Sequence, residues 1–202
     1  DPKLLKTETG KRLYERYQQA NAISEKVTGN NAIARFFSSM RSTGKAAVEE
    51  GFFRSVWHQT TAIADQYNEP GKFTAFIGYE WTSSVSAANV NFASLHRVVI
   101  FKDSAEKTDK IMPLSTFDSR DPEDLWQFME EYQQQFGGEV LAIPHNGNLG
   151  FGEMFKLTDL DGRPLSSSYA KTRSQWEPLY EVTQIKGDSE THSLLSPTDE
   201  FA

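Results

Sequence analysis

The sequence contains no cysteine and only four histidines among its 202 residues. The missing cysteine excludes disulfide bonds, thiolate zinc sites and a cysteine nucleophile. The sequence also lacks the G-x-G-x-x-G and P-loop nucleotide motifs, the H-E-x-x-H zinc motif and the G-x-S-x-G motif of serine hydrolases. Its apolar runs are far shorter than the ~20 residues of a membrane-spanning helix, so we expect no membrane span. No signal or transit pattern indicates a compartment.

Positive charge is scarce, since 21 Lys and Arg stand against 28 Asp and Glu, for a formal net charge of −7. An acidic chain is poorly suited to the phosphate backbone of nucleic acids or to an anionic membrane surface. We therefore expect no nucleic-acid partner. Hydrophobic residues make up 38% of the chain, which is enough for a substantial core at this length.

The composition changes near Pro70-Gly71. Before this point the pattern is polar and helical, and its clearest part is 53–67, where apolar residues recur at the spacing of one helical face. His58 lies on the polar side of that helix, where we expect a solvent-exposed side chain. We predict a helical segment over 1–70 that packs on a second part, 71–202.

The second part alternates between strand and helix signals. Asp121-Pro122 is a strong helix start and Gly137-Gly138 a strong helix end. The first strand is apolar on both faces, which is typical of a strand covered on both sides. A helix, two glycines and a short apolar strand are typical of a parallel sheet or barrel, so the predicted class is α/β. The predicted strands are 73–80, 95–101, 140–143 and 180–186, and the predicted helices are 121–136 and 168–176.

Glu80 ends the first of these strands and His96 opens the second. The fifteen residues 81–95 between them are tight for a helical crossover and long for a hairpin, and we favour the hairpin. A hairpin brings Glu80 and His96 to one rim of the sheet, whereas a crossover separates them. A carboxylate and an imidazole at one rim suit a divalent metal, or a general base with its orienting partner. The alternative is a surface glutamate and a partly buried histidine that never meet.

His145 directly follows the strand 140–143, and Asn146-Gly147 after it predicts a tight turn. Catalytic groups and ligands collect at the carboxyl ends of strands in parallel α/β folds. We therefore expect His145 at a functional rim, with simple capping of a turn as the alternative. A cluster of polar residues follows the predicted strand 180–186, and it also could form part of the functional rim. The alternative is a polar loop held by its own hydrogen bonds. The ionisable residues of this cluster are Asp188, Glu190 and His192.

Three segments in this order resemble the middle of the polymerase and histidinol phosphatase (PHP) superfamily. Its members carry a Gly-x-Glu strand end, a histidine that opens the next strand, and an Ala-His-Pro-like strand end. The matching segments are Gly78-Tyr79-Glu80, Leu95–Ile100 and Ile143-Pro144-His145.

Longer strings resemble an uncharacterised bacterial branch that is known only as a domain of unknown function with a PHP-like fold. This resemblance runs from about Asp1 to Ala202. The strings that carry it are Phe73–Thr82, Leu141–Asn148 and Trp176–His192.

The resemblance implies a distorted β/α barrel with two or three divalent metals (Mn, Zn or Fe) at its carboxyl rim. It implies Glu80 as a bridging carboxylate, with His96 and His145 as metal ligands. Such metals lower the pKa of a bound water and hold phosphoryl oxygens, which implies phosphoester hydrolysis of a small anionic substrate. Asn146 replaces the usual proline after the third motif histidine, which alters the loop. Four residues are kept only as rim or substrate candidates: Asn146, Asp188, Glu190 and His192.

The sequence departs from the family pattern because it has neither the His-x-His of the first strand nor the Asp-x-His of the last. The chain also opens at Asp1 without methionine and closes on a segment that does not read as a domain end. We therefore expect it to be the central part of a partial barrel, incomplete at both ends; loss of the full site in this branch is the alternative. We expect this piece alone to be inactive, to bind metal weakly or not at all, and to self-associate through exposed strands.

Two functions follow from these observations. The first is a metal-dependent hydrolase, specifically a phosphoesterase. The second is a non-catalytic module that binds a sugar or peptide through exposed aromatic residues, namely Tyr79, Trp81 and Phe92. The second reading predicts that Glu80 is far from His96 and that Trp81 and Phe92 form an exposed patch.

Overall fold

The computed structural model describes residues 4–8, 10–12, 14, 15, 18, 50–87, 90–185 and 187–189. The chain divides into two compact units, Asp1–Trp57 and His58–Ala202. In the first unit lie the 3-10 helix η1 (Leu4–Lys6) and the start of helix α3 (Glu50–Tyr67), which continues into the second unit. Residues 19–49 of the predicted helical segment lie outside the described residues, and the predicted division into 1–70 and 71–202 stays a prediction.

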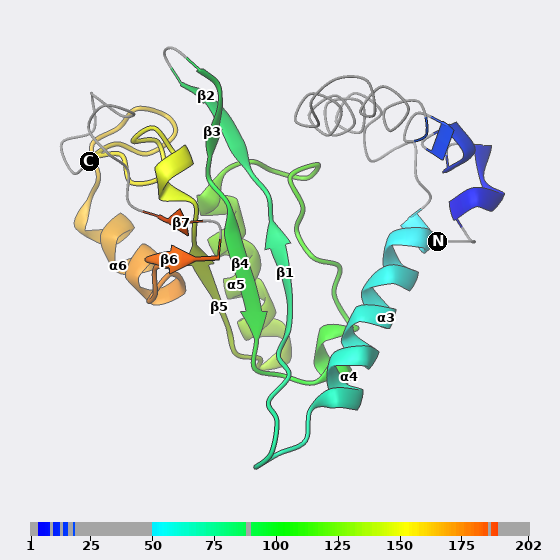
Figure 1. The fold of residues 1–202 in the computed structure, drawn as a ribbon. Coiled ribbons are helices and arrows are strands. Elements are labelled where there is room, and N and C mark those ends of the chain that lie inside the picture. Colours follow the sequence, from blue (N-terminus) through cyan, green and yellow to red (C-terminus); the bar gives the residue numbers. More distant parts are fainter. Residues whose placement is uncertain are drawn as a thin grey trace. The chain divides into compact units, whose positions relative to one another are not determined.

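The second unit is built on a three-stranded sheet in the order β1–β4–β5 (Figure 1). Its strands are β1 (Ile77–Trp81), β4 (Arg97–Phe101) and β5 (Val140–Pro144). Both pairs are antiparallel, so β1 and β5 run in the same direction and end at the rim where β4 begins. The predicted hairpin relation between the first two strands is therefore confirmed.

The expectation that β5 pairs with a parallel neighbour is wrong within this sheet, because β5 pairs with β4 in the antiparallel sense. The cause is the path of the chain between the two strands. Helix α4 (Ala105–Thr108) follows β4, and the next loop then returns to the rim, where Ser83 Oγ donates to the carbonyl oxygen of Arg120 at 2.8 Å. Helix α5 (Pro122–Phe136) therefore starts at the rim and leads the chain back to the opposite end before β5 begins.

The first strand is shorter than predicted. Glu69 and Phe73 exchange backbone hydrogen bonds of 2.8 and 2.9 Å, which close a tight turn, and β1 begins only at Ile77. Phe73 and Phe76 are exposed. The prediction of a strand over 73–80 that is covered on both faces is therefore wrong for its first four residues, since β4 already ends opposite Ile77.

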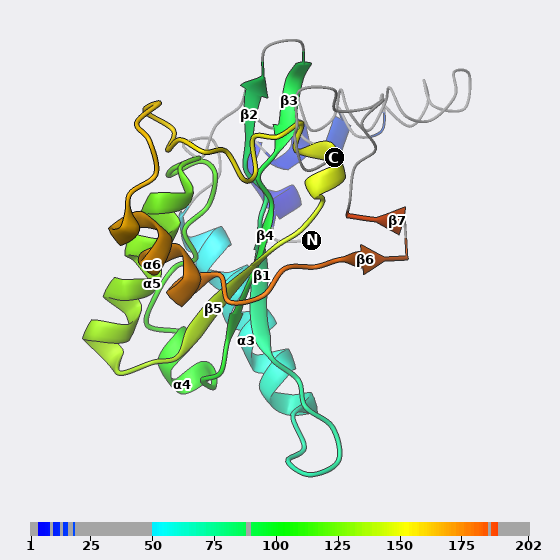
Figure 2. The same ribbon diagram turned by 90° about the vertical axis from the view of Figure 1, so that its left-hand side faces the viewer.

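The residues between β1 and β4 form a second hairpin that we did not predict. Strands β2 (Ser84–Ala87) and β3 (Val90–Ser94) pair in the antiparallel sense, with Ser84 opposite Ser94. This hairpin extends beyond the end of the three-stranded sheet (Figure 2). The fifteen-residue insertion is thus neither a crossover nor an irregular loop.

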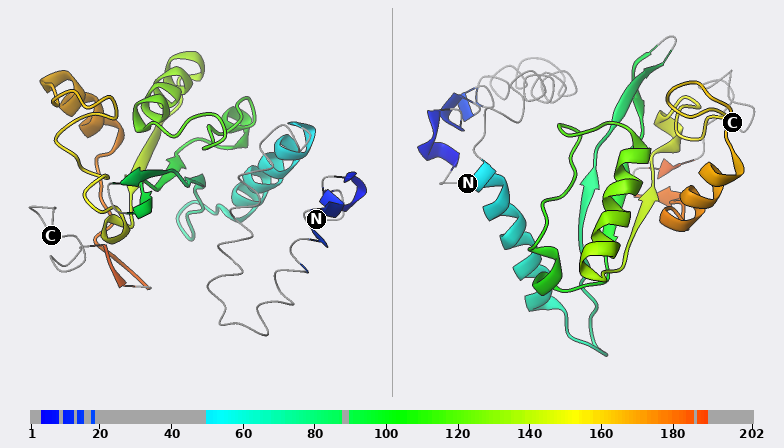
Figure 3. Two further views of the ribbon diagram at one scale, coloured as in Figure 1. Left: turned by 90° about the horizontal axis from the view of Figure 1, so that it is seen from above. Right: turned by 180° about the vertical axis from the view of Figure 1, so that it is seen from behind.

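Helix α5 forms where its end signals predict. The Asp121 side chain accepts a hydrogen bond from the backbone of Glu123, and Gly137 ends the helix at φ 58°. Tyr132 from the buried face packs edge-on against Phe101, with ring centroids 5.1 Å apart. Helices α5 and α6 (Ser167–Trp176) lie on the same side of the sheet (Figures 2 and 3).

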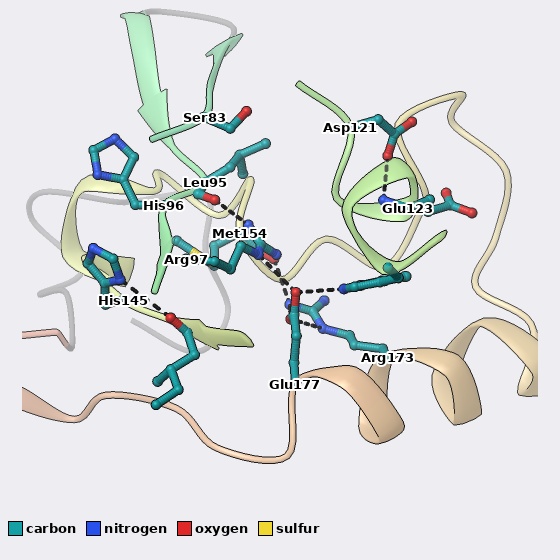
Figure 4. Close-up of polar contacts among 12 residues, drawn as sticks. Ser83, Leu95, His96, Arg97, Asp121, Glu123, His145, Met154, Arg173 and Glu177 are labelled. Carbon is teal, nitrogen blue, oxygen red and sulfur yellow. Dashed lines mark hydrogen bonds and ion pairs between the residues drawn. The ribbon is translucent and has the colours of Figure 1, made fainter. Parts of the chain in front are cut away.

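A buried ion pair joins this helical side to the sheet. The side chains of Arg97 and Glu177 are each only 1% exposed, and Arg97 Nε donates to Glu177 Oε1 at 2.8 Å. Trp126 Nε1 donates to the same oxygen at 2.9 Å, and Arg173 Nε donates to Oε2 at 3.1 Å (Figure 4). One carboxylate thereby connects β4, α5 and α6.

Two further predictions are confirmed only in part. Helix α3 exists, but Ile63 and Tyr67 of its predicted buried face are exposed. Thr61, on its polar side, is buried and donates to Asp109 Oδ1 at 2.6 Å, because this side of the helix meets α4 through hydrogen bonds. The predicted strand 180–186 is reduced to β6 (Thr183–Gln184), which pairs with β7 (Gly187–Asp188).

The predicted α/β class is confirmed, and the described ranges contain no closed barrel. None of the helices that the structure describes has the length and apolar content needed to cross a bilayer.

Replacing Glu177 with glutamine should destabilise the fold by about 3–5 kcal/mol, because it leaves the Arg97 guanidinium buried without a counter-charge. Urea unfolding followed by circular dichroism measures the change. Glu139→Gln is the matched control: it breaks the exposed Lys102–Glu139 pair and should cost below about 1 kcal/mol. Equal effects of the two substitutions would contradict this account.

Candidate metal centre

Three predicted site residues meet at one rim of the sheet. Glu80 lies at the carboxyl end of β1, His96 immediately precedes β4, and His145 immediately follows β5. The backbone N–H of His145 donates to the carbonyl oxygen of His96 at 3.2 Å, which extends the β4–β5 ladder by one residue. The two histidines therefore stand opposite each other across the strand pair.

The two imidazoles share one oxygen of the glutamate. His145 Nε2 lies 2.9 Å from Glu80 Oε1, and His96 Nδ1 lies 3.1 Å from the same oxygen. The imidazole centroids are 5.8 Å apart with an interplanar angle of 74°, and Figure 4 shows the two side chains next to each other. One donor atom from each residue lies within 4.8 Å of the others. Donors of a tetrahedral ion with bonds of ~2.0–2.2 Å stand about 3.4 Å apart, so small side-chain movements suffice for binding.

The centre lies on the face of the sheet opposite to α5. Side chains alternate between the faces of a strand, and Trp81 and Arg97, the neighbours of Glu80 and His96, are fully buried. The histidine side chains are shielded, with 14% of His96 and 7% of His145 exposed, whereas 48% of the Glu80 side chain is exposed. The centre is thus open to solvent on the carboxylate side.

The loop after His145 is held in place by the β6–β7 hairpin. Asn146 is buried in the left-handed conformation at φ 61°, and its Oδ1 accepts from Gln184 Nε2 at 2.7 Å. A Cβ atom on Gly147 would lie 2.0 Å from the hydroxyl of Tyr180 and 3.0 Å from the carbonyl oxygen of Ser189, so a larger residue would displace the Tyr180 side chain. His145 Nδ1 also lies 3.4 Å from the carbonyl oxygen of Ile143, which leaves Nε2 directed at Glu80.

The electrostatics favour a cation at this point. Hydrogen bonds from His145, and then from His96, hold the pKa of the Glu80 carboxyl well below its usual range. Burial opposes this change and is the smaller effect. The site therefore presents an ionised carboxylate between two imidazoles, which is a donor set for a divalent metal.

The remaining candidates have different outcomes. Asn146 lies next to His145 and supports its loop, and Asp188 lies in β7. Glu190 and His192 lie outside the described residues. His58 is half-buried, and no described residue hydrogen-bonds its buried Nε2, so the expectation of a solvent-exposed side chain is wrong.

The aromatic patch required by the binding-module reading does not form as predicted. Trp81 is completely buried, and Glu80 is in hydrogen-bonding contact with His96 rather than far from it. Phe92 is exposed as expected, and its ring stands edge-on to the His96 ring.

Sequence reasoning missed the residues that support the centre from outside. Gln184 was one ordinary polar residue in a predicted strand, and no local pattern links it to Asn146. Arg97 is one of 21 basic residues in the chain, and its type alone does not single it out. The position of Arg97 between His96 and a run of β-branched residues could have indicated a buried ion pair. An arginine in a buried strand needs a counter-charge.

The fold and the donor cluster define a mixed α/β protein with a candidate divalent-metal centre. The chain belongs to the family described as "Protein of unknown function (DUF3604)", whose family model matches residues 1–202. The expected membership in an uncharacterised family is thereby confirmed. Neither the curated proteins nor the solved structures contain a match to the chain.

The lowered pKa of Glu80 predicts a pH-dependent contribution to the stability of the metal-free protein. A carboxylate with a depressed pKa stabilises the fold above its unfolded pKa of about 4.3, and this contribution is lost as the pH falls toward the folded value. The difference in unfolding free energy between wild type and Glu80→Gln should therefore shrink as the pH falls below about 4.

Chemical denaturation at a series of acidic pH values measures this difference. Glu131→Gln, which removes a surface carboxylate on α5, is the matched control and should show little pH dependence. A difference for Glu80→Gln that stays constant through this window would mean that the imidazoles do not stabilise the ionised carboxylate.

Proposed function

We propose that this protein is a metal-dependent hydrolase acting on phosphoesters, and that Glu80, His96 and His145 bind a divalent ion. The observation that supports this proposal is the convergence of two imidazoles and one carboxylate from three separate strand ends. Residues that are 16 to 65 positions apart in the chain come together there. A purely structural pair would need only one of these contacts.

The donor set favours particular metals. Two imidazole nitrogens and a carboxylate oxygen suit Mn, Zn or Fe better than Ca or Mg, which prefer all-oxygen sites. When bound, such an ion acts as a Lewis acid and lowers the pKa of a coordinated water. The chain's own residues would orient it: His96 and His145 from shielded positions, and Glu80 from the open side.

The choice of phosphoesters rests on the PHP-like resemblance. We also propose that the described sheet is part of a partial β/α barrel whose further strands lie outside that sheet. The protein would be of bacterial origin. The barrel proposal is supported by the order of the three motifs and by the shared direction of β1 and β5, whose carboxyl ends meet at one rim. The substrate would be a small anionic molecule held through its phosphoryl group.

The three donors that the described part of the chain brings together cannot fill two or three metal shells of four to six positions each. We therefore propose that these 202 residues bind a single divalent ion weakly and do not turn over substrate by themselves. The alternative, a non-catalytic module with exposed aromatics, stays a prediction; the burial of Trp81 removes one of its three named aromatics.

Calorimetric titration with Zn²⁺ and Mn²⁺ tests the metal site. The chain should bind one ion with a dissociation constant below the millimolar range. Loss of a residue that only supports a metal ligand lowers metal affinity roughly 10- to 100-fold. The double substitution Glu80→Ala/His145→Ala removes two ligands themselves and should lower the affinity by more than that. Glu131→Ala/His58→Ala removes the same residue types elsewhere and should leave binding unchanged. Unchanged affinity in the Glu80/His145 variant would refute the proposed site.

A further inference from the structure

An aromatic side chain stands directly beside the candidate metal centre. The ring of Phe92 lies edge-on to the ring of His96, with centroids 6.0 Å apart and an interplanar angle of 86°. The His96 ring is in turn 5.8 Å from that of His145. Phe92 is 37% exposed, so part of its ring is accessible to solvent.

The β2–β3 hairpin explains why Phe92 occupies this place. The hairpin continues outward from the rim that carries the centre (Figure 2). Its last residues are anchored, since Ala93, Ser94 and Leu95 are buried and the backbone of Leu95 donates to Ser83 at 2.9 Å. Phe92 immediately precedes this anchored stretch, and its partly exposed ring contacts His96. The residues that follow Phe92 are therefore packed, which fixes where its backbone lies relative to His96.

A phenyl ring cannot donate to a metal or hydrogen-bond a phosphoryl oxygen. It offers apolar surface and a π face, and it keeps water away from the adjacent part of the site. Small-molecule sites combine such apolar walls with a few polar groups that fix orientation. Here Glu80, His96 and His145 would hold a metal ion that contacts the anionic phosphoryl group, and Phe92 lies next to His96.

We propose that Phe92 determines substrate specificity, and that the site takes phosphoryl compounds bearing an aryl or similarly flat apolar group. This inference rests on the proposed function, because it requires the metal to hold the phosphoryl end. It adds the chemical class of the organic part, which packs against the exposed part of the Phe92 ring.

The test uses two non-hydrolysable probes on the Co²⁺-loaded protein, phenylphosphonate and methylphosphonate. Binding is followed through the visible absorption of the cobalt, so turnover is not needed. Wild type should bind phenylphosphonate about fivefold more tightly than methylphosphonate. Phe92→Ala should abolish this preference, and Phe92→Tyr, which keeps the ring, should restore it.

Phe76→Ala is the matched control, because it removes an exposed phenylalanine that precedes β1 at the end of the sheet remote from Glu80. It should leave both affinities unchanged. If both phosphonates bind equally and Phe92→Ala changes neither affinity, the Phe92 inference is wrong and the metal site stands. If cobalt binds but neither phosphonate changes its spectrum, the proposed phosphoryl chemistry itself fails.

Discussion

The buried contact between Arg97 and Glu177 is the interaction on which the arrangement of the centre depends. Arg97 lies opposite Trp81 on β1 and opposite Pro144 on β5, so these three residues form one row across the sheet. Each member of the row is the immediate neighbour in sequence of a centre residue, namely Glu80, His96 or His145. Fixing this row on the helical side thereby fixes the three donors on the other side.

A buried ion pair is weak evidence for added stability, because desolvation of both charges offsets much of their attraction. Its consequence here is the register. A slip of one residue in β4 would exchange the two faces, burying His96 against the helices and exposing Arg97. Glu177 accepts hydrogen bonds from Arg97, Arg173 and Trp126, and a slipped strand would leave this carboxylate without its main counter-charge. The buried polar contacts of Glu177 on the helical face therefore fix the strand register that places the three metal donors on the opposite face.

The sequence predicted the centre better than the fold around it. Glu80, His96 and His145 could be placed because strand ends and a hairpin relation are local signals, and Asp121 and Gly137 marked α5 for the same reason. The direction of β5 could not be predicted, because it depends on the path of the loop before α5. The β2–β3 hairpin could not be predicted because its segment is rich in serine, alanine and asparagine, which are weak strand formers. The burial of Trp81 and the Gln184–Asn146 contact arise only from tertiary packing.

The central claim is that two imidazoles and one carboxylate hold a single ion at this rim. X-ray absorption at the zinc edge of the zinc-loaded protein tests it most directly. The account predicts a shell of nitrogen and oxygen donors at about 2.0–2.2 Å, with the outer-shell scattering of two imidazoles. A shell without imidazole scattering, or a spectrum that His96→Ala leaves unchanged, would contradict it.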